Sequence, residues 1–264
     1  MKKFVISFVF SIVKKENYMY NNFYENKKVG IFMKLLKKLI GIVILVLIAI
    51  TAFFVKQGYD LYEKAINEIS IEDKIAEIKS KENYTVYDEL PKNYVNAVIA
   101  VEDKRFFYHH GVDIISVARA FFIDIKEMEF EEGGSTITQQ LAKNIYFTQE
   151  KKITRKVAEM FMAVELEKNI SKEEIFELYV NTSYFGDGYY CVKDASLGYF
   201  DKNPSEMNLY ECTLLAGIPN APSVYAPTKN PELARQRQGQ VLRKMLKQKL
   251  ISEEEAGKIL LVSE

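Results

Sequence analysis

Cysteine and histidine are scarce in this chain, which has two of each among its 264 residues. Cys191 and Cys212 are too few for a disulfide framework, and their separation does not match the spacing of metal ligands. His109 and His110 are adjacent and have no third ligand nearby, which disfavours a zinc site. The sequence therefore argues against redox chemistry and against structural zinc as the basis of function.

Strand-like alternation of apolar and polar residues is also missing, and no internal repeat is present. Helix-start signals are frequent instead. Residues 136–139, 171–174 and 252–255 fit capping boxes, and Asn230 precedes a proline as an N-cap residue often does. A content of 48% hydrophobic and 27% charged residues suffices for one core, or for one domain with a membrane anchor. We expect a mostly α-helical fold.

Charge is absent from a stretch of seventeen residues, 39–55. As a helix this stretch is about 26 Å long, which is enough to cross a thin bilayer core. Residues 1–38 carry nine lysines and two glutamates, whereas Asp60 and Glu63 follow the stretch. By the positive-inside rule, a single-pass helix in the plasma membrane leaves the N-terminus in the cytoplasm and the rest outside. A cleaved signal peptide fits less well because no small-residue cleavage site follows.

These features divide the chain into five expected segments. They are a basic cytoplasmic tail (1–38), a transmembrane helix (39–55), a stalk (56–83), a main domain (84–250) and a C-terminal helix (251–264). Met33 begins a sequence typical of a natural start, with lysines and then the apolar run. Residues 1–32 are therefore expected to be an upstream extension of little functional weight.

Glu102 and Asp103 form a carboxylate pair that follows an apolar run, residues 97–101, and precedes Phe106 and His109. A carboxylate that loses water among apolar and aromatic side chains can act as a general base near neutral pH. Glu102 is therefore a candidate catalytic residue. For Asp103 two interpretations are about equally good: a residue of the site, or a surface carboxylate at the end of a helix.

A second cluster, residues 133–144, concentrates hydroxyl and amide side chains around one cation, Lys143. Such a set of donors suits a ligand that is rich in oxygen and phosphate. Within it, residues 136–139 would cap a helix in any protein. Gln139 is therefore expected to serve the fold, and Gln140 the site.

A third candidate is Glu159, which lies in an apolar helical stretch, residues 157–166, where the one other charge is Glu165. A carboxylate in such a stretch needs a partner. Arg155, one turn back, can supply it, and so can a metal ion or a cationic ligand. From this pattern alone, an ion pair on the helix surface is the simpler interpretation.

Taken together, these stretches resemble the peptidoglycan glycosyltransferase family, the polymerase module of bifunctional penicillin-binding proteins and of monofunctional enzymes. The resemblance runs from about residue 84 to about residue 250. It is carried by Glu102-Asp103 with Phe106, His109 and Gly111; by Gly134-Ser135-Thr136 with Thr138, Gln140 and Lys143-Asn144; by Arg155-Lys156 with Glu159; by Lys172, Glu174 and Asn181 with Tyr184-Phe185-Gly186; and by Ala221-Pro222 with Asn230-Pro231 and Arg237. No Ser-x-x-Lys signature follows, so the chain looks like the monofunctional type.

The resemblance implies a lysozyme-like helical fold with two lobes that polymerises lipid II, a lipid-linked disaccharide-peptide, into β-1,4 glycan strands outside the membrane. In that scheme Glu102 takes the proton of the acceptor's 4-hydroxyl, which attacks the donor's anomeric carbon with inversion and releases polyprenyl pyrophosphate. Glu159 is the second catalytic residue and holds a divalent cation, Mg or Mn. The implied substrate-binding residues are Asp103, Phe106, His109, Ser135, Thr136, Thr138, Gln140, Lys143, Asn144, Lys151 and Arg155.

The implied partners are lipid II, the growing lipid-linked glycan chain, the membrane and other cell-wall synthesis proteins. Nucleic acid is not among them. In this family a lobe next to the site dips into the bilayer, and Phe122 and Ile123 are expected to make that contact here.

Four residues depart from the family pattern. Cys191 and Asp201 stand where glycine is usual, and Asp194 stands where a small or polar residue is common. They lie in a mainly structural motif, so we expect an effect on stability more than on chemistry. Lys151 stands where arginine is frequent. Lysine keeps the positive charge but cannot make the paired hydrogen bonds to phosphate that a guanidinium makes.

Two other functions remain open at this point. A lysozyme-like peptidoglycan hydrolase would use two carboxylates and a water, but it would not need a cation-rich cluster or a membrane tether. A non-catalytic cell-wall scaffold would keep the anchor and the fold. It would have little physical reason to keep Glu102, Lys143, Arg155 and Glu159 together.

Overall fold

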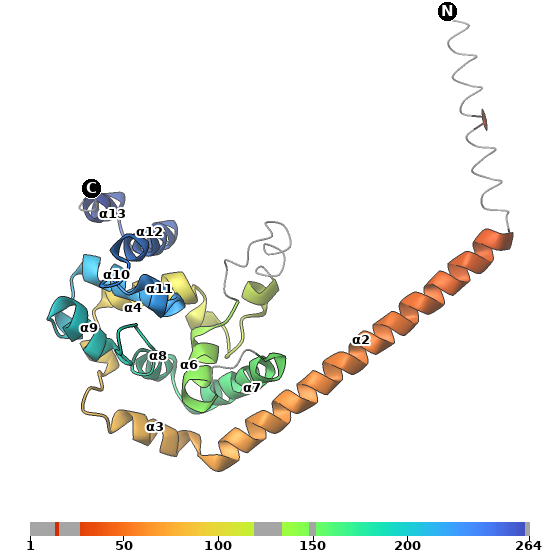
Figure 1. Cartoon of the computed structure of the whole chain (residues 1–264), viewed down its shortest axis with the longest axis horizontal. Coiled ribbons are helices and arrows are strands. Elements are labelled where there is room, and N and C mark those ends of the chain that lie inside the picture. Colours follow the sequence, from red (N-terminus) through yellow and green to blue (C-terminus); the bar gives the residue numbers. More distant parts are fainter. Residues whose placement is uncertain (1–13, 16–26, 119–133, 148–151, 262–264) are drawn as a thin grey trace, which may run out of the picture. The chain divides into compact units, whose positions relative to one another are not determined.

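The computed structural model describes residues 14–15, 27–118, 134–147 and 152–261, in two compact units, Met1–Lys56 and Gln57–Glu264. All named elements of this described part are helices, and the β contact found there is an isolated bridge between His110 and Val112. The predicted mostly α-helical class is confirmed (Figure 1).

The first unit contains the N-terminal part of a long helix, α2 (Lys27–Glu68). From Leu35 to Glu68, α2 is long and apolar enough to cross a membrane, judged by length and composition. Between residues 39 and 55 nearly every side chain is exposed, as expected for a surface that lipid covers. The predicted transmembrane helix, 39–55, lies within this span.

The second unit is built from the rest of α2 and a series of shorter helices (Figure 1). These are α3 (Ile71–Lys79), η1 (Tyr87–Glu89), α4 (Lys92–Glu102), η2 (Phe106–Tyr108), α6 (Ile137–Tyr146), α7 (Ile153–Asn169), α8 (Lys172–Val180), α9 (Val192–Phe200), η3 (Pro204–Glu206), α10 (Leu209–Gly217), η4 (Ile218–Asn220), α11 (Pro222–Tyr225), α12 (Pro231–Lys247) and α13 (Glu253–Leu261).

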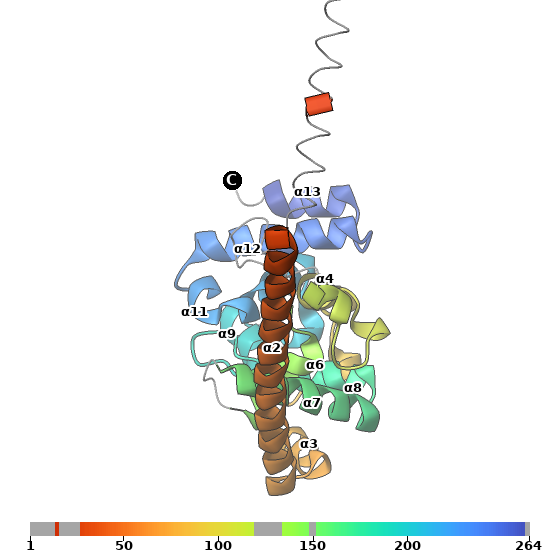
Figure 2. The ribbon, with the colours of Figure 1, turned by 90° about the vertical axis from the view of Figure 1, so that its right-hand side faces the viewer.

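Two groups of helices make the core of this unit. α4 packs against α10 and α12, and α6 packs against α7 and α8. In both views, α12 and α13 lie at one end and α6, α7 and α8 at the other (Figures 1 and 2). The apolar run 97–101 lies in α4 and is buried throughout, which explains why it lacks a polar face. The catalytic candidate Glu102 follows directly at the end of this helix.

The predicted helix starts are confirmed. Thr136 forms a capping box with Gln139 at the start of α6, and Ser171 caps α8. Asn230 is the N-cap residue of α12 and is followed by proline at N1, and Ser252 accepts a hydrogen bond from the backbone of Glu255. Gln139 thus serves the fold, as expected.

The departures in the structural motif have physical explanations. The Cys191 sulfur accepts from the backbone N–H of Asp194 at 3.4 Å, so cysteine acts as the N-cap of α9. The Asp194 carboxylate accepts from Asn83 Nδ2 at 2.7 Å, which ties α9 to the segment before α4. Asp201 ends α9 in the left-handed region, with φ of 54°. Aspartate adopts this region at a cost that glycine would avoid.

The expected stalk, 56–83, lies within the second unit from Gln57 onward. Ala65 is buried in the hydrophobic core, and Tyr62 and Ile66 pack against it. The end of α2 therefore contributes to the stability of this unit.

Two truncations should separate the anchor from this packing. Deleting residues 1–56 should leave a domain that melts like the full chain but associates more weakly with membranes. Deleting residues 1–69 removes the apolar contacts of Tyr62, Ala65 and Ile66, and should lower the melting temperature by roughly 5–10 °C. Thermal unfolding by circular dichroism in the same detergent measures both. Equal melting temperatures for the two truncations would contradict this assignment.

Candidate functional site

The two carboxylate oxygens of Glu102 have different surroundings: one accepts a hydrogen bond, and the other is buried without a hydrogen-bond partner among the described residues. Gln140 of α6 donates from Nε2 to Glu102 Oε2 at 2.8 Å, and Gln140 Oε1 accepts from the Tyr179 hydroxyl at 3.3 Å. Burial raises the pKa of Tyr179 well above its ordinary value, so this hydroxyl remains a donor and fixes the orientation of the amide. Glu102 Oε1 is buried, lies 3.6 Å from Arg237 Nη2, and has no hydrogen-bond partner among the described residues.

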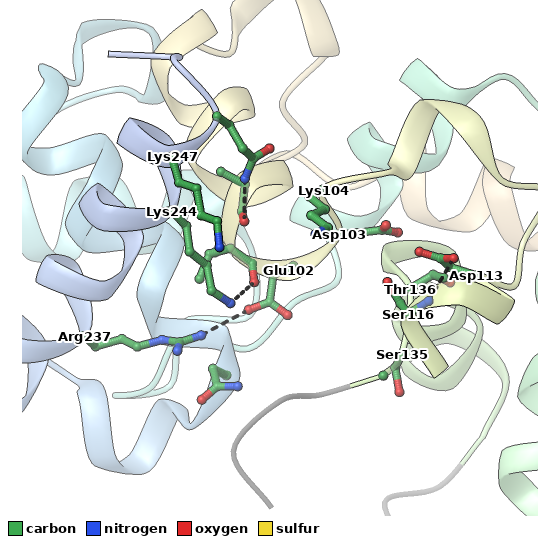
Figure 3. A pocket seen from close by; sticks show the side chains of 15 residues that line it. Glu102, Asp103, Lys104, Asp113, Ser116, Ser135, Thr136, Arg237, Lys244 and Lys247 are labelled. Carbon is green, nitrogen blue, oxygen red and sulfur yellow. Dashed lines mark hydrogen bonds and ion pairs between the residues drawn. The ribbon is translucent and has the colours of Figure 1, made fainter. Parts of the chain in front are cut away.

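Glu102 lines a pocket of about 300 Å³ (Figure 3). The pocket is lined by Ala100, Val101, Glu102, Asp103, Lys104, Asp113, Ser116, Gly134, Ser135, Thr136, Asn220, Arg237, Lys244, Lys247 and Gln248. Figure 3 shows the α12 cations Arg237, Lys244 and Lys247 on one side of Glu102 and Ser135 and Thr136 on the other. The open carboxylate therefore lies between a cationic wall and a set of hydroxyl groups.

α12 also covers the end of α4. Lys244 Nζ donates to the carbonyl of Val101, and Gln248 Nε2 donates to the carbonyl of Ala100, both at 3.2 Å. The last carbonyls of a helix have no partner within it and favour a nearby cation. These contacts fix the C-terminal end of α4, where Glu102 lies.

Asp103 joins the end of α4 to the start of α6. It is 6% exposed, and its Oδ2 accepts from the backbone N–H of Ile137 at 3.1 Å and lies 2.7 Å from His109 Nε2. The alternative of a surface carboxylate is thus wrong for Asp103. Because α6 carries Gln140, this contact sets the distance between Glu102 and its hydrogen-bond donor.

A buried ionic network lies behind the carboxylate pair. Glu167 of α7 accepts from the Thr138 hydroxyl at 2.6 Å and pairs with Lys172 of α8 at 2.7 Å. His109 Nδ1 lies 3.7 Å from Glu167, and Lys172 Nζ lies 4.6 Å from the centre of the Phe106 ring. Three residues expected to bind substrate, Phe106, His109 and Thr138, belong to this network and do not line the pocket.

A second cationic cluster surrounds Glu159, which is 1% exposed. Glu159 Oε1 lies 2.9 Å from Arg155 Nε, and Oε2 accepts from Lys156 Nζ at 2.9 Å. Lys156 also donates to the Ser135 hydroxyl, at 2.5 Å, which connects the cluster to the pocket. The ion pair of Arg155 and Glu159 is thus buried at its acidic end, so the interpretation as a simple surface pair is wrong.

Lys143 of α6 adds a third cation near Glu159. Burial lowers its pKa, the charge of Glu159 acts in the opposite direction, and Lys156 and Arg155 lower it further. Three cations around one buried carboxylate leave an excess of positive charge beside Ser135. Such a cluster favours an anionic ligand.

The residues around Glu159 do not fit a resident divalent cation. No group of three or more His, Cys, Asp or Glu side chains that could hold a metal occurs in the described residues. Both oxygens of Glu159 already face cations. A carboxylate shared by two cationic side chains would have to release them before it could coordinate a metal.

Asn144 and Lys151 are the other two residues that the resemblance assigns to substrate binding. Asn144 follows Lys143 on α6 and is partly exposed. Lys151 lies outside the described residues, as do Phe122 and Ile123, the expected membrane contacts.

Sequence reasoning missed a role for Lys156 and for the α12 cations. Arg237, Lys244 and Lys247 recur on one face of α12 at the spacing of helix turns, which is a detectable signal for a basic stripe. Nothing local indicates that this stripe faces Glu102, because that depends on how α12 packs on α4.

Asp113 supports the opposite wall of the pocket. Its carboxylate pairs with Arg105 and accepts from the backbone N–H groups of Ile115 and Ser116, each at 3.1 Å. Burial acts to raise the pKa of Asp113, but hydrogen bonds from Arg105 and Ser116 outweigh it and hold the pKa at about 2.

Comparisons with known proteins identify a family that matches most of this chain. A family model described as Transglycosylase matches residues 71–246. Penicillin-binding protein 1F of Bacillus subtilis is 44% identical over 185 residues, which is 70% of this chain and 26% of that protein. A Cupriavidus necator protein whose name describes it as a transglycosylase is 41% identical over 174 residues, 66% of this chain and 75% of that protein.

A crystal structure of penicillin-binding protein 1A from Haemophilus influenzae is also similar, with 31% identity over 47% of this chain and 15% of that one, and a TM-score of 0.33. The chain spans about a quarter of the length of the penicillin-binding proteins of Bacillus subtilis and Aquifex aeolicus that it matches.

Asp113→Asn should destabilise the chain in a pH-dependent way. The folded pKa of about 2 lies below the unfolded value of about 3.9, so the charged form contributes stability above pH 4 that is lost as pH falls towards 2. At pH 7 the variant should lose about 2 kcal/mol, and the difference from the wild type should shrink at pH 3. Urea unfolding at both pH values measures this, with the exposed Asp88→Asn as control. A pH-independent difference would contradict the assignment.

Proposed function

The chain belongs to the transglycosylase family, and from this premise we propose that it is a membrane-anchored peptidoglycan glycosyltransferase that polymerises lipid II. The observation that supports this best is the carboxylate of Glu102. One oxygen is held by Gln140, and the other is buried at the pocket without a hydrogen-bond partner in the described part of the chain. A positioned acceptor of this kind suits a general base.

In the proposed reaction, the 4-hydroxyl of the acceptor sugar donates a hydrogen bond to Glu102 Oε1 in the pocket. Glu102 takes the proton as the hydroxyl oxygen attacks the anomeric carbon of the lipid-linked donor, and the configuration at that carbon inverts. The bond from this carbon to the pyrophosphate breaks, and its electron pair leaves with the phosphate oxygen. Arg237 Nη2 lies 3.6 Å from Oε1 and places positive charge beside the carboxylate.

Negative charge grows on the pyrophosphate as it leaves. Lys143, Arg155 and Lys156 lie together beside Ser135, and their excess positive charge suits that group. We assign Glu159 the task of orienting Arg155 and Lys156. A divalent cation would add positive charge to the pyrophosphate, and its involvement stays a prediction.

The apolar helix and the penicillin-binding relatives indicate a membrane-anchored protein. For its orientation we propose a cytoplasmic N-terminus and an extracytoplasmic second unit, supported by nine lysines among residues 1–38. Lipid II and the growing glycan chain are the proposed substrates. Interactions with other cell-wall synthesis proteins stay a prediction.

The hydrolase alternative is less well supported. A glycosidase of that kind needs a second carboxylate to activate water or to attack the sugar. The other carboxylates that line the pocket are Asp103 and Asp113, and both are engaged by internal donors. The scaffold alternative gives no reason for an open buried oxygen at Glu102.

Glu102→Gln should abolish polymerisation and keep the fold. The amide preserves the volume of the side chain but lacks the basic oxygen, and loss of a general base typically costs about a hundredfold to ten-thousandfold in rate. The measurement is the length and amount of glycan made from purified lipid II, read on a gel. The exposed Glu82→Gln is the matched control and should polymerise like the wild type. Glu102→Gln with a wild-type melting temperature and a wild-type rate would exclude Glu102 as the base.

Glu159→Gln should lower the rate about tenfold to a hundredfold at every concentration of Mg or Mn, because Arg155 and Lys156 lose their shared anchor. Glu165→Gln on the same helix breaks an exposed pair with Lys168 and is the matched control. Effects of Lys143→Ala and Arg155→Ala should not add to that of Glu159→Gln. The assay is the initial rate against added metal, with and without chelator. A defect seen only when metal is present would assign Glu159 to a metal site instead.

A further inference from the structure

The outer end of α2, residues 58–68, packs against α7, the helix that carries Arg155, Lys156 and Glu159 (Figure 1). The ring of Phe161 on α7 lies 5.3 Å from that of Tyr59 and 6.0 Å from that of Tyr62, measured between centroids. Contacts of offset or edge-to-face aromatic rings stabilise such helix pairs. The same helix that contains the predicted membrane span is thus in contact with the helix that carries the proposed leaving-group site.

Gly58 permits the closest part of this contact. A Cβ atom at residue 58 would lie 2.5 Å from both Cβ and Cγ1 of Val157, and 3.0 Å from the carbonyl oxygen of Thr154. These atoms belong to the first turns of α7 and include its backbone, so they cannot move aside as the end of a flexible side chain could. A side chain at residue 58 would force the two helices apart. By contrast, Gly41 in the same helix has nothing within 4 Å of such an atom.

The first turn of α7 needs support from outside the helix. Its N-cap residue, Lys152, makes no side-chain capping hydrogen bond, and the turn contains no acidic residue. Arg155 and Lys156 place positive charge near the positive end of the helix dipole, which is unfavourable. The charges that suit a pyrophosphate therefore weaken the turn that carries them, and tertiary packing has to hold it.

We propose that residues 58–68 of α2 position the cationic cluster of α7, and that Gly58 is the positioning residue through which they do so. The inference rests on the proposed function in that the cluster is taken to bind a pyrophosphate. Gly58 touches Val157, the direct neighbour of Lys156, so a shift at this contact moves Lys156 relative to Ser135 and Glu159. Residues 58–68 of α2 thereby help to position the side chains that bind the anion.

The test uses the full chain in detergent micelles, with inorganic pyrophosphate as the probe and calorimetry as the measurement. Gly58→Ala should weaken pyrophosphate binding about tenfold, since a small misplacement of charged groups has a large effect on a positioned site. Gly41→Ala is the matched control and should bind like the wild type. Alanine favours a helix more than glycine does, so helix propensity alone predicts no loss in either variant.

A second substitution separates positioning from general damage. Val157→Gly removes Cβ and Cγ1 of Val157, the two atoms 2.5 Å from a Cβ at residue 58, and leaves the Thr154 carbonyl oxygen at 3.0 Å. In that background, Gly58→Ala should lower pyrophosphate affinity clearly less than it does in the wild type, although Val157→Gly alone weakens α7. Amide hydrogen exchange over residues 153–158 should be faster in Gly58→Ala than in Gly41→Ala.

Three results would overturn the inference. They are equal pyrophosphate affinity in Gly58→Ala and Gly41→Ala, an equal loss from Gly58→Ala with and without Val157→Gly, and a wild-type chain that does not bind pyrophosphate. Polymerisation of lipid II is scored separately. A wild-type chain that binds pyrophosphate with the expected variant pattern but makes no glycan would contradict the proposed function and leave the positioning role of Gly58 supported.

Discussion

The contact between Asp103 and the start of α6 is the constraint on which the site depends. Glu102 ends one helix and Gln140 lies in the first turns of another, and these helices belong to different packing groups of the second unit. Asp103 accepts from the first backbone amide of α6 and from His109, so the two helix ends are joined by a buried carboxylate. A buried carboxylate requires such donors, because an unpaired one would be strongly unfavourable. The Glu102–Gln140 hydrogen bond then follows from the arrangement of the helices.

The two glutamates of the site show how environment divides their roles. Glu102 keeps one oxygen without a hydrogen-bond partner among the described residues, and Arg237 lies 3.6 Å from that oxygen. Glu159 has a cation 2.9 Å from each of its oxygens. The first arrangement leaves a lone pair for a proton, and the second uses both oxygens to hold positive charge in place. Under the proposed function, two residues of the same type would therefore serve acid–base chemistry and electrostatics respectively.

Much of this arrangement can be predicted from local sequence. The apolar run 97–101 indicates a buried helix that ends in a carboxylate, and residues 136–139 indicate where α6 begins. Side-chain direction is harder to predict. A threonine at position 138 could face the pocket or the core, and its donation to Glu167 depends on how α6 packs on α7. The α12 cations face Glu102 for a similar reason, since their contact with α4 joins segments that are distant in sequence.

The hydrogen bond from Tyr179 to Gln140 restricts how this pocket can change under selection by an inhibitor. Gln140 accepts a hydrogen bond from Tyr179 and donates one to Glu102. Among uncharged side chains of this length, the amide is the group that can do both. A glutamate there would oppose the charge of Glu102, and an aliphatic residue would leave the buried hydroxyl of Tyr179 without its acceptor. A compound that contacts Gln140 and the open oxygen of Glu102 would therefore meet a surface with few tolerated substitutions. Substitutions would be tolerated more readily at the exposed cationic edge of the pocket, where Lys247 lies.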